Sequence, residues 1–475
     1  MKRASAMLIL WAALVIALPA QTFTFTVLHS FCIQLGCTGG EDPIAALLQA
    51  SNGKLYSTTS SGGIDFVGGT VFEITTGGTF KELYSFCSQP ECTDGNRAYR
   101  ALVQAPDDYL FGVTMYGGTN CPDGGCGTVF KTSPAGAFTN VYDFCSLSNC
   151  ADGDGPNGAL ILNNENKMYG TTEFGGSYGG GTVFRITETG NLETLYSFCA
   201  LSACQDGTEP VGALVLGPDG AFYGTTALGG AHNLGTVFTI RPSGPLTTLH
   251  SFAGADGNDP VGALLPATNG YFYGTTVYGG AYNMGEVFQM TADGTLTPLY
   301  SFCGCGDGQY PSAGLVQATD GNLYGTTAGQ GETPGTLFRI SLGGDFTSLY
   351  TFCSQPNCAD GISPQAALIQ DTNGLLYGTA EGNDANSGTI FSVSLGLGPF
   401  VKTLPGFGPL GAKVEILGTD LTGATSVTFN GTPAAFTVVQ SSEIETTVPI
   451  GATSGKVEVV TPGGTLASNV AFRVD

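Results

Sequence analysis

Fourteen cysteines are the most regular set of reactive side chains in this 475-residue sequence. Twelve of them form six pairs with four residues between the partners: Cys32 and Cys37, Cys87 and Cys92, Cys121 and Cys126, Cys145 and Cys150, Cys199 and Cys204, and Cys353 and Cys358. Paired cysteines in an exported protein form disulfides. Zinc is the alternative, but it needs a second ligand pair nearby, and the chain has only three histidines. We therefore predict six disulfides and no metal ligands.

Two further cysteine positions break this pattern. Cys303 and Cys305 are separated by one residue, so a direct bridge would be strained and the sequence leaves their state open. In the fifth copy of the repeat described below, Ala253 and Ala255 stand where the others carry cysteine. The joint loss indicates that the two thiols of a pair act together.

An Asp-Gly-x-x-Pro motif follows most of these pairs. Its aspartates are Asp152, Asp206, Asp256, Asp307 and Asp360. Asp accepts local backbone hydrogen bonds, Gly takes an unusual φ and Pro fixes the exit, so the motif favours a turn. Carboxylates near backbone carbonyls also suit Ca²⁺, and these five aspartates are the candidate ligand-binding acids. No EF-hand spacing is present, and no other cofactor is expected.

A catalytic set is not recognisable. His29 and His250 occupy a strand position that is Tyr in five other copies, and His232 lies in a loop without an evident partner. No nucleophile elbow or nucleotide-binding glycine loop occurs in the right context. Aromatic residues before Gly-Gly doublets, Tyr116, Phe174 and Tyr278, are candidates for a sugar-stacking rim, with simple loop packing as the alternative.

The elements that position these residues come from a repeat of four short blocks. The blocks resemble ALVQA, LYGTT, GTVF and LYSF, and each occurs seven times at intervals of about 50 residues. Their Val, Tyr, Phe and Thr content with Gly, Asn and Asp between them is typical of strands and tight turns. Four strands per repeat predict an all-β, seven-bladed β-propeller. A β-solenoid is the alternative.

Ring closure follows from the block order. The repeats begin with a lone outer strand around residues 23–31 and end without one, so we expect the first strand to complete the last blade. The loops on one face are then long, and they hold 18 Asp or Glu against two basic residues, Arg97 and Arg100. Such a face attracts cations or a basic partner; a merely solvated surface is the alternative.

The chain ends suggest export and a second domain. Lys2 and Arg3 precede an apolar run, which predicts a signal peptide over residues 1–20, with an uncleaved anchor as the alternative. No later segment is long enough to span a membrane. We expect residues 21–397 to form the propeller and residues 398–475 to form a small immunoglobulin-like β-sandwich. Without residues 1–20 the net charge is −25, from 13 Lys and Arg and 38 Asp and Glu, which disfavours nucleic acid as a partner.

Two family resemblances follow from these motifs. The LYGTT, Gly-Gly, GTVF and LYSF order over residues 22–394 resembles the GloVer tandem repeat of secreted bacterial proteins. The run from Gly411 to Gly464 resembles the IPT/TIG immunoglobulin-like domain, which implies an interaction or spacer module. The repeat family implies location and architecture and no particular chemistry.

The expected function is binding or adhesion at the cell surface without catalysis, through the acidic loop face and an extracellular glycan or protein. A carbohydrate-active hydrolase or lyase that uses loop carboxylates is the first alternative, since pairs of acids carry out glycoside hydrolysis. A structural spacer is the second.

Overall fold

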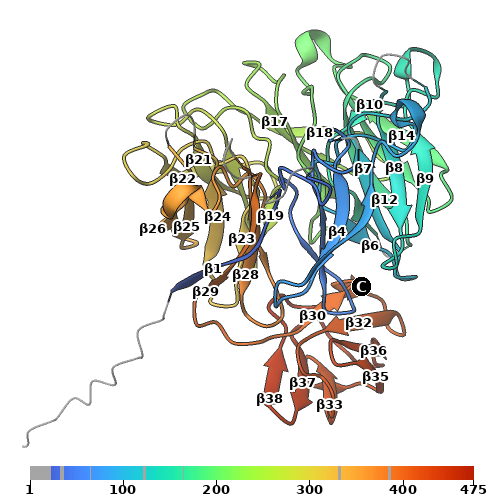
Figure 1. The fold of residues 1–475 in the computed structure, drawn as a ribbon, viewed down its shortest axis with the longest axis vertical. Coiled ribbons are helices and arrows are strands. Elements are labelled where there is room, and N and C mark those ends of the chain that lie inside the picture. The colour runs from blue at the N-terminus through green and yellow to red at the C-terminus, as the bar shows by residue number, and fades with distance from the viewer. Residues whose placement is uncertain are drawn as a thin grey trace, which may run out of the picture.

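Seven antiparallel sheets stand side by side in a ring in the computed structural model, which describes residues 23–475 except 33–36, 65, 121–124, 164, 330–332 and 383–386. Figure 1 shows the ring above a smaller β-domain. The seven-bladed propeller followed by an immunoglobulin-like sandwich is therefore confirmed, and the solenoid alternative is wrong. The predicted signal peptide lies outside the described residues.

Each blade has four strands in the sequence order of the blocks. The innermost strands are β2 (Leu48–Gln49), β6 (Val103–Gln104), β11 (Ile161–Leu162), β15 (Val215–Leu216), β19 (Leu265–Pro266), β23 (Val316–Gln317) and β27 (Ile369–Gln370). The second strands are β3 (Leu55–Thr58), β7 (Leu110–Thr114), β12 (Met168–Phe174), β16 (Phe222–Thr226), β20 (Phe272–Thr276), β24 (Leu323–Thr327) and β28 (Leu376–Ala380). The short strand β10 (Asp154–Pro156) also pairs with β12.

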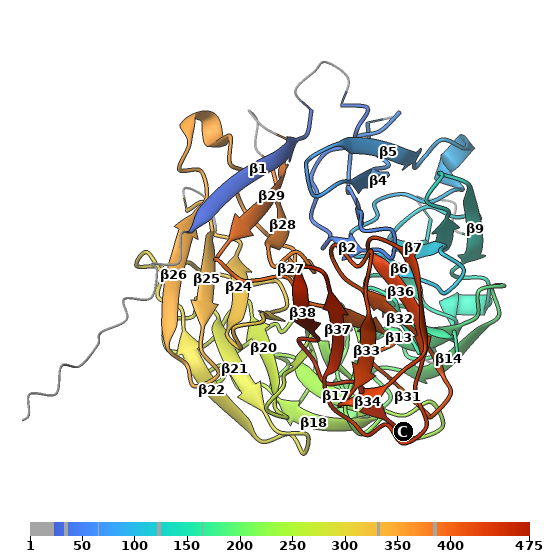
Figure 2. The same ribbon diagram turned by 90° about the horizontal axis from the view of Figure 1, so that it is seen from below.

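The outer half of each blade is formed by the other two blocks. The third strands are β4 (Thr70–Ile74), β8 (Thr128–Thr132), β13 (Thr182–Ile186), β17 (Thr236–Ile240), β21 (Glu286–Met290), β25 (Thr336–Ile340) and β29 (Thr389–Ser394). The outermost strands are β5 (Phe80–Ser85), β9 (Phe138–Asp143), β14 (Leu192–Ser197), β18 (Thr247–Ser251), β22 (Leu296–Ser301), β26 (Phe346–Thr351) and β1 (Thr24–Ser30). Seen from below in Figure 2, β27, β2 and β6 lie near the centre and β5, β22 and β26 at the periphery.

The first strand closes the ring. β1 pairs antiparallel with β29 of the last blade, with Thr24 opposite Ser394 and Val27 opposite Phe391. This confirms the predicted closure by residues 23–31. Because β1 covers the outer side of β29, the third strand of the last blade has no unpaired edge.

Phenylalanines join neighbouring blades and explain two of the repeated blocks. The Phe that follows each outer strand packs edge-on against the Phe of the third strand in the next blade, as in Phe144 on Phe184 with ring centroids 5.2 Å apart. The other six pairs are Phe31–Phe72, Phe86–Phe130, Phe198–Phe238, Phe252–Phe288, Phe302–Phe338 and Phe352–Phe391. All these rings are buried, so each pair contributes apolar burial and edge-to-face attraction between blades.

Glycine in the LYGTT block makes room for this packing. A Cβ on Gly170 would lie 2.6 Å from the Phe184 ring and 2.9 Å from a methyl group of Leu160. Close approach, rather than backbone conformation, therefore favours glycine at this position, which is Ser57 in the first blade.

The C-terminal domain is a sandwich of two four-stranded sheets. One has the order β30 (Lys402–Leu404), β32 (Lys413–Leu417), β36 (Glu443–Thr447) and β35 (Phe436–Gln440); the other has β34 (Thr432–Pro433), β33 (Ser426–Phe429), β37 (Val457–Thr461) and β38 (Gly464–Ala467). A parallel pair, β31 (Phe407–Gly408) and β39 (Arg473–Val474), lies beside them. Val414, Ile444 and Val457 are among the residues of its buried core.

The sandwich covers the face of the ring that carries the turns between first and second strands. Ser442 Oγ donates to the Ser51 carbonyl at 2.7 Å, and Asn469 Nδ2 donates to the Gln317 carbonyl at 2.9 Å. Arg473 Nη1 donates to the Pro218 carbonyl at 2.7 Å. The opposite face, with the long loops, is left free. Within the described residues, none of the helical segments has the length and apolar character to cross a bilayer.

Candidate binding site on the loop-bearing face

The long loops that lead from each outer strand to the next inner strand share one internal hydrogen-bond device. In the loop after β9, the buried Asp152 accepts hydrogen bonds from the Tyr142 hydroxyl at 2.8 Å, from the Ser146 amide at 2.9 Å and from the Leu147 amide at 3.1 Å. Burial of the ring, and after it the contact with Asp152, raise the pKa of Tyr142 to about 12. The carboxylate thereby holds its own loop against the strand that precedes it.

The same device recurs in other loops. The equivalent pairs are Tyr84–Asp94, Tyr196–Asp206, His250–Asp256, Tyr300–Asp307 and Tyr350–Asp360. In the loop after β1, Gly39 stands at the aspartate position, and the matching strand residue is His29, whose ring stacks on Phe80. Tyr or His with a bonded acid is thus a structural pair, and the first loop lacks it.

These contacts favour the turn-acceptor alternative for the motif aspartates over their assignment as ligand-binding acids. Asp152, Asp206, Asp307 and Asp360 are buried and Asp256 is half-buried, and each accepts hydrogen bonds inside its own loop, although Asp307 Oδ1 has no partner. They act as the turn acceptors that the sequence also suggested, so we leave them out of the binding site. Asp94 was missed because Ala98, not Pro, ends its motif.

The cysteine pairs close the same loops. Disulfides join Cys32 to Cys37, Cys87 to Cys92, Cys145 to Cys150, Cys199 to Cys204 and Cys353 to Cys358. The structure also joins Cys303 to Cys305, the pair whose state the sequence left open. Four of the loops carry a short 3-10 turn that ends at the second cysteine: η1 (Pro90–Cys92), η2 (Ser148–Cys150), η3 (Ser202–Cys204) and η4 (Pro356–Cys358).

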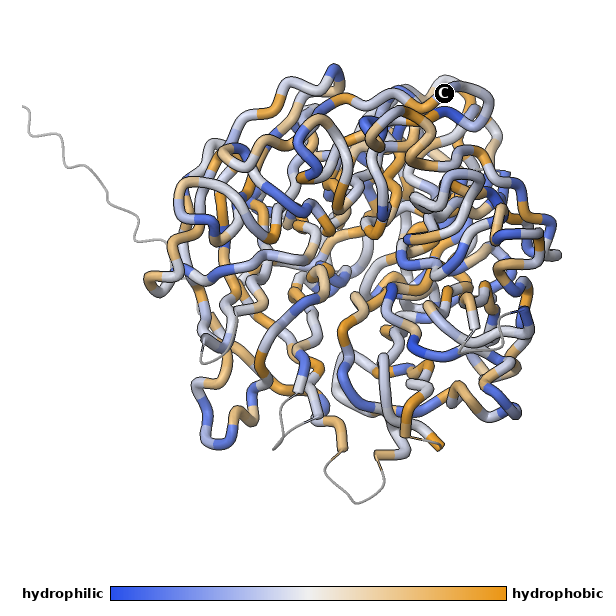
Figure 3. Tube along the Cα trace, turned by 90° about the horizontal axis from the view of Figure 1, so that it is seen from above, coloured by the Kyte–Doolittle hydropathy of each residue, from blue (hydrophilic) through white to orange (hydrophobic). Residues whose placement is uncertain are grey.

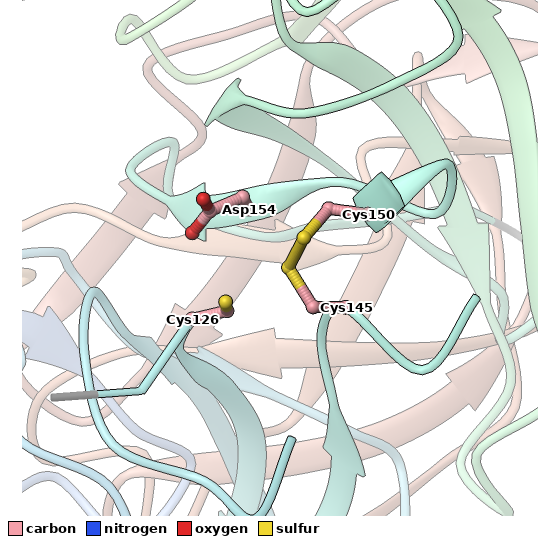
Figure 4. A group of neighbouring side chains, drawn as sticks. All are labelled: Cys126, Cys145, Cys150 and Asp154. Carbon is pink, nitrogen blue, oxygen red and sulfur yellow. A yellow bond between two sulfur atoms is a disulfide. The ribbon is translucent and has the colours of Figure 1, made fainter. Parts of the chain in front are cut away.

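One group of sulfur and oxygen atoms is close enough together to resemble a metal site. Figure 4 shows Cys126, Cys145, Cys150 and Asp154, which come from neighbouring loops. The Cys145–Cys150 sulfurs are bonded to each other, and Cys126 is also disulfide-bonded, while its predicted partner Cys121 lies outside the described residues. A cysteine binds a metal as the thiolate, so this group, whose cysteines are all oxidised, does not fit a metal.

A second repeated feature lies at the loop end next to the inner strand. The residue before Pro43, Ala98 or the motif proline has a left-handed backbone in all seven blades, with φ between 46° and 62°. We call these the ring positions: Asp42, Arg97, Gly155, Glu209, Asp259, Tyr310 and Ser363. Each amide donates to a carbonyl of the preceding blade, such as Glu209 to Gly180 at 3.0 Å and Asp42 to Ser387 at 2.9 Å. The backbone of the ring positions therefore binds neighbouring blades together.

The side chains at the ring positions, in contrast, do not repeat. Six of the seven are not glycine, although a left-handed conformation costs a non-glycine residue about 1 kcal/mol. Glycine would adopt this conformation without strain. A non-glycine residue at such a position therefore indicates that its side chain has a function. Three of the six are acidic: Asp42, Glu209 and Asp259.

Two acids from the ends of second strands join these three. Burial, and secondly the charge of Glu173, raise the pKa of Glu209. Burial, and secondly the charge of Glu209, raise the pKa of Asp259 to about 6. Around the ring, burial and the charge of Asp42 raise the pKa of Glu381. We call Asp42, Glu173, Glu209, Asp259 and Glu381 the acidic ring.

One basic side chain reaches this ring through a hydrogen-bonded neighbour. Arg100 Nε donates to the backbone carbonyl of Asn157 at 2.7 Å and to its side-chain oxygen at 2.8 Å. Asn157 Nδ2 donates in turn to Glu173 Oε2 at 2.7 Å. In the other six blades the residue that matches Arg100 is Gly or Ala. Arg100 therefore compensates part of the negative charge of Glu173, and no equivalent arginine stands in the other blades.

The predicted aromatic rim stands beside the ring positions. Tyr116, Phe174 and Tyr278 are 36%, 41% and 37% exposed, large fractions for aromatic side chains. The Arg97 guanidinium lies 5.6 Å from the Tyr116 ring, and Tyr278 packs edge-on against Tyr310 with centroids 5.2 Å apart. The structure thus places the rim on the loop face, which Figure 3 shows from above.

The fold and this site define the class: a seven-bladed propeller with an immunoglobulin-like cap on one face and a variable acidic and aromatic ring on the other. The Gloeobacter/Verrucomicrobia repeat model matches residues 12–214 and 200–391, so the chain belongs to this repeat family. The IPT/TIG domain model matches residues 401–474.

Among curated proteins no match was found. Solved structures with some likeness include hydrazine synthase of Kuenenia stuttgartiensis, at 14% identity and a TM-score of 0.47 over 74% of this chain and 95% of that one. A putative 6-phosphogluconolactonase from Bacteroides fragilis shares 16% identity, with a TM-score of 0.44, over 77% of this chain and 90% of that one. A putative oxidoreductase (glucose dehydrogenase) from Thermus thermophilus shares 13%, with a TM-score of 0.38, over 78% and 100%.

Proposed function

We propose that this protein is a secreted or cell-surface binding protein that acts without catalysis and uses the acidic ring and the aromatic rim to hold a cationic group of an extracellular glycan or protein. One observation carries the proposal: seven copies of the same backbone site hold different side chains, mostly acidic or aromatic, at a cost in backbone strain. A residue with a structural role is expected at the same position of every blade, whereas the residues that recognise one ligand differ from blade to blade.

The chemistry of the ring suits a cation. Burial together with a neighbouring carboxylate raises the pKa of both Glu209 and Asp259, and a cation between such groups relieves their repulsion. Exposed aromatic faces add cation–π attraction or stacking on a sugar. With the sandwich on the opposite face, a large partner has free access to the loop side only.

Export is part of the same proposal. Residues 1–20 act as the signal peptide, residues 21–397 as the propeller and residues 398–475 as the IPT/TIG domain. Disulfides in the loops support an oxidising location.

The test is an array of glycans and basic peptides probed with the intact protein at low and high salt. We expect binding to amine-bearing or basic probes that weakens with salt. The variant Glu173→Gln/Glu209→Gln/Asp259→Asn removes three acids of the ring and should lose this binding. Its matched control is Glu188→Gln/Asp293→Asn/Asp345→Asn, which makes the same charge change in turns on the opposite face.

The controls decide the outcome. Equal loss in both triple variants would reduce the effect to net charge and overturn the ring as the site. Unchanged binding in both triple variants would also overturn the ring as the site. No binding to any probe would favour the structural spacer.

A carbohydrate-active hydrolase is the second candidate, because Asp259 combines a pKa of about 6 with a neighbouring carboxylate, Glu209, as a general acid would. Release of reducing ends from a polysaccharide, lost in both Asp259→Asn and Glu209→Gln, would establish it. Binding without release supports the first proposal.

A further inference from the structure

A second site lies between the propeller and the sandwich. A cleft of about 1130 Å³ opens between residues 101–106 and 159–162 of the second and third blades and residues 404–409, β32, β35 and β36 of the sandwich. This volume is large enough for a small organic molecule.

Hydrogen bonds on either side of the cleft join the two domains and fix their positions around it. On one side Gln440 and Ser442 bind the Ser51 carbonyl of the first blade. On the other side Arg473 binds the carbonyls of Gly217 and Pro218 in the fourth blade. The second and third blades between them form the floor of the cleft. The cleft is therefore a built feature of the domain arrangement.

Most of its lining is apolar. Val103 and Ile161 come from the inner strands of the propeller, and Leu404, Phe407 and Phe436 come from the sandwich. Leu404 remains 38% exposed although it faces the cleft. Covering such side chains with an apolar ligand removes them from water, which favours binding by about 25 cal/mol per Å² of apolar surface.

Two carboxylates face each other in the same lining. Glu415 on β32 is the direct register partner of Glu445 on β36, and like charges directly opposite each other on paired strands repel. None of the ion pairs formed within the described residues involves either one, and the one lysine of the lining, Lys413, is exposed two residues away. Burial, and after it the charges of Glu443, Asp108 and Glu445, raise the pKa of Glu415 to about 7.

We propose that this cleft binds an amphipathic organic cation, with its apolar part against Ile161, Leu404, Phe407 and Phe436 and its cationic group between Glu415 and Glu445. The charge of the ligand would remove the cross-strand repulsion, and its apolar part would cover the exposed lining. This site is separate from the loop face and does not depend on the proposed function.

The experiment is calorimetric titration of the intact protein with dodecyltrimethylammonium below its micelle concentration, alongside dodecanoate, which has an apolar chain of the same length and the opposite charge. We expect the cation to bind and dodecanoate not to bind. The variant Glu415→Gln/Glu445→Gln should weaken binding about tenfold or more, a loss of about 1.4 kcal/mol. It should fold, because the change removes a repulsion.

A matched variant locates the effect. Asp420→Asn/Glu458→Gln makes the same charge change at exposed positions elsewhere on the sandwich and should bind the cation as the unaltered protein does. Unchanged affinity in Glu415→Gln/Glu445→Gln, equal loss in Asp420→Asn/Glu458→Gln, equal binding of dodecanoate, or no binding of the cation would overturn the proposal.

Discussion

Arg100 of the second blade holds Asn157 of the third through two hydrogen bonds from one nitrogen, at 2.7 Å to the backbone carbonyl and 2.8 Å to the side-chain oxygen. Through the Asn157 amide this contact extends to Glu173. A single arginine therefore links two blades and steadies one acid of the loop face.

Replacing Arg100 with Ala should destabilise the propeller by about 2 kcal/mol, because the hydrogen bonds to Asn157 are lost and Glu173 loses a compensating cation. The backbone accepts the change, since Ala45, Ala313 and Ala366 occupy the matching positions in other blades. Denaturant unfolding measures the difference. Arg97→Ala, an exposed arginine nearby, is the control and should change stability by less than about 0.5 kcal/mol.

Asp152→Ala should cost more than any one of the hydrogen bonds that Asp152 accepts. It leaves the Tyr142 hydroxyl and two loop amides without their acceptor, so we expect a loss of about 3 kcal/mol in the free energy of unfolding. Tyr142→Phe removes one of these bonds and should cost about 1 kcal/mol. Equal effects of the two variants would contradict a shared acceptor that holds the whole loop.

Removing one disulfide should be tolerated. Cys145→Ala/Cys150→Ala opens a short loop, which we expect to lower the free energy of unfolding by about 2 kcal/mol or less. The loop after β18, which has Ala253 and Ala255 and keeps the His250–Asp256 contact, shows that a loop of this kind forms without sulfur. Complete loss of folding in this variant would contradict that interpretation.

Glu209→Gly should separate stability from binding. Glycine takes the left-handed conformation without strain, and Gly155 already does so in the third blade. We expect a midpoint of thermal unfolding that is unchanged or higher, together with weaker binding of the cationic probe. A fall in both would assign Glu209 a structural role instead.

The raised pKa of Asp259 predicts a pH effect of known sign. Because the folded protein favours the protonated carboxyl, this group supports folding fully below about pH 4 and loses that contribution as the pH rises through about 6. Asp259→Asn should therefore raise the unfolding midpoint at pH 7.5 and change it little at pH 4. Asp345→Asn, an exposed acid on the opposite face, is the control for a general charge effect.

Much of the fold was predictable because its causes repeat. The Phe of LYSF and the Phe of GTVF meet between every pair of blades, so the repeat spacing reports the packing itself. The ring closure followed from a missing outer strand. The innermost strands are shorter than their blocks suggested, since only two residues of each form the ladder.

The site was less predictable because its members do not repeat and lie far apart in the sequence. Tyr116, Phe174 and Tyr278 were found through the Gly-Gly doublets that follow them. Counting acids showed that the loop face is negative, but it could not separate Asp152, which is buried inside its loop, from Asp259, which lies at a ring position. The left-handed backbone distinguishes the ring positions from the other loop acids. It is a conformational property, so counting residue types does not reveal it. In the sequence, six of the seven directly precede a proline.

The pairing of β1 with β29 also sets an order of events for biosynthesis. Since its two strands are at opposite ends of the repeat region, the final sheet cannot form until the last repeat has left the ribosome. Until then the first six sheets of the nascent chain form an open arc, and both ends of the arc expose unpaired surface that favours aggregation. We expect chaperones that shield such edges to matter more for this protein during its synthesis than at any later time.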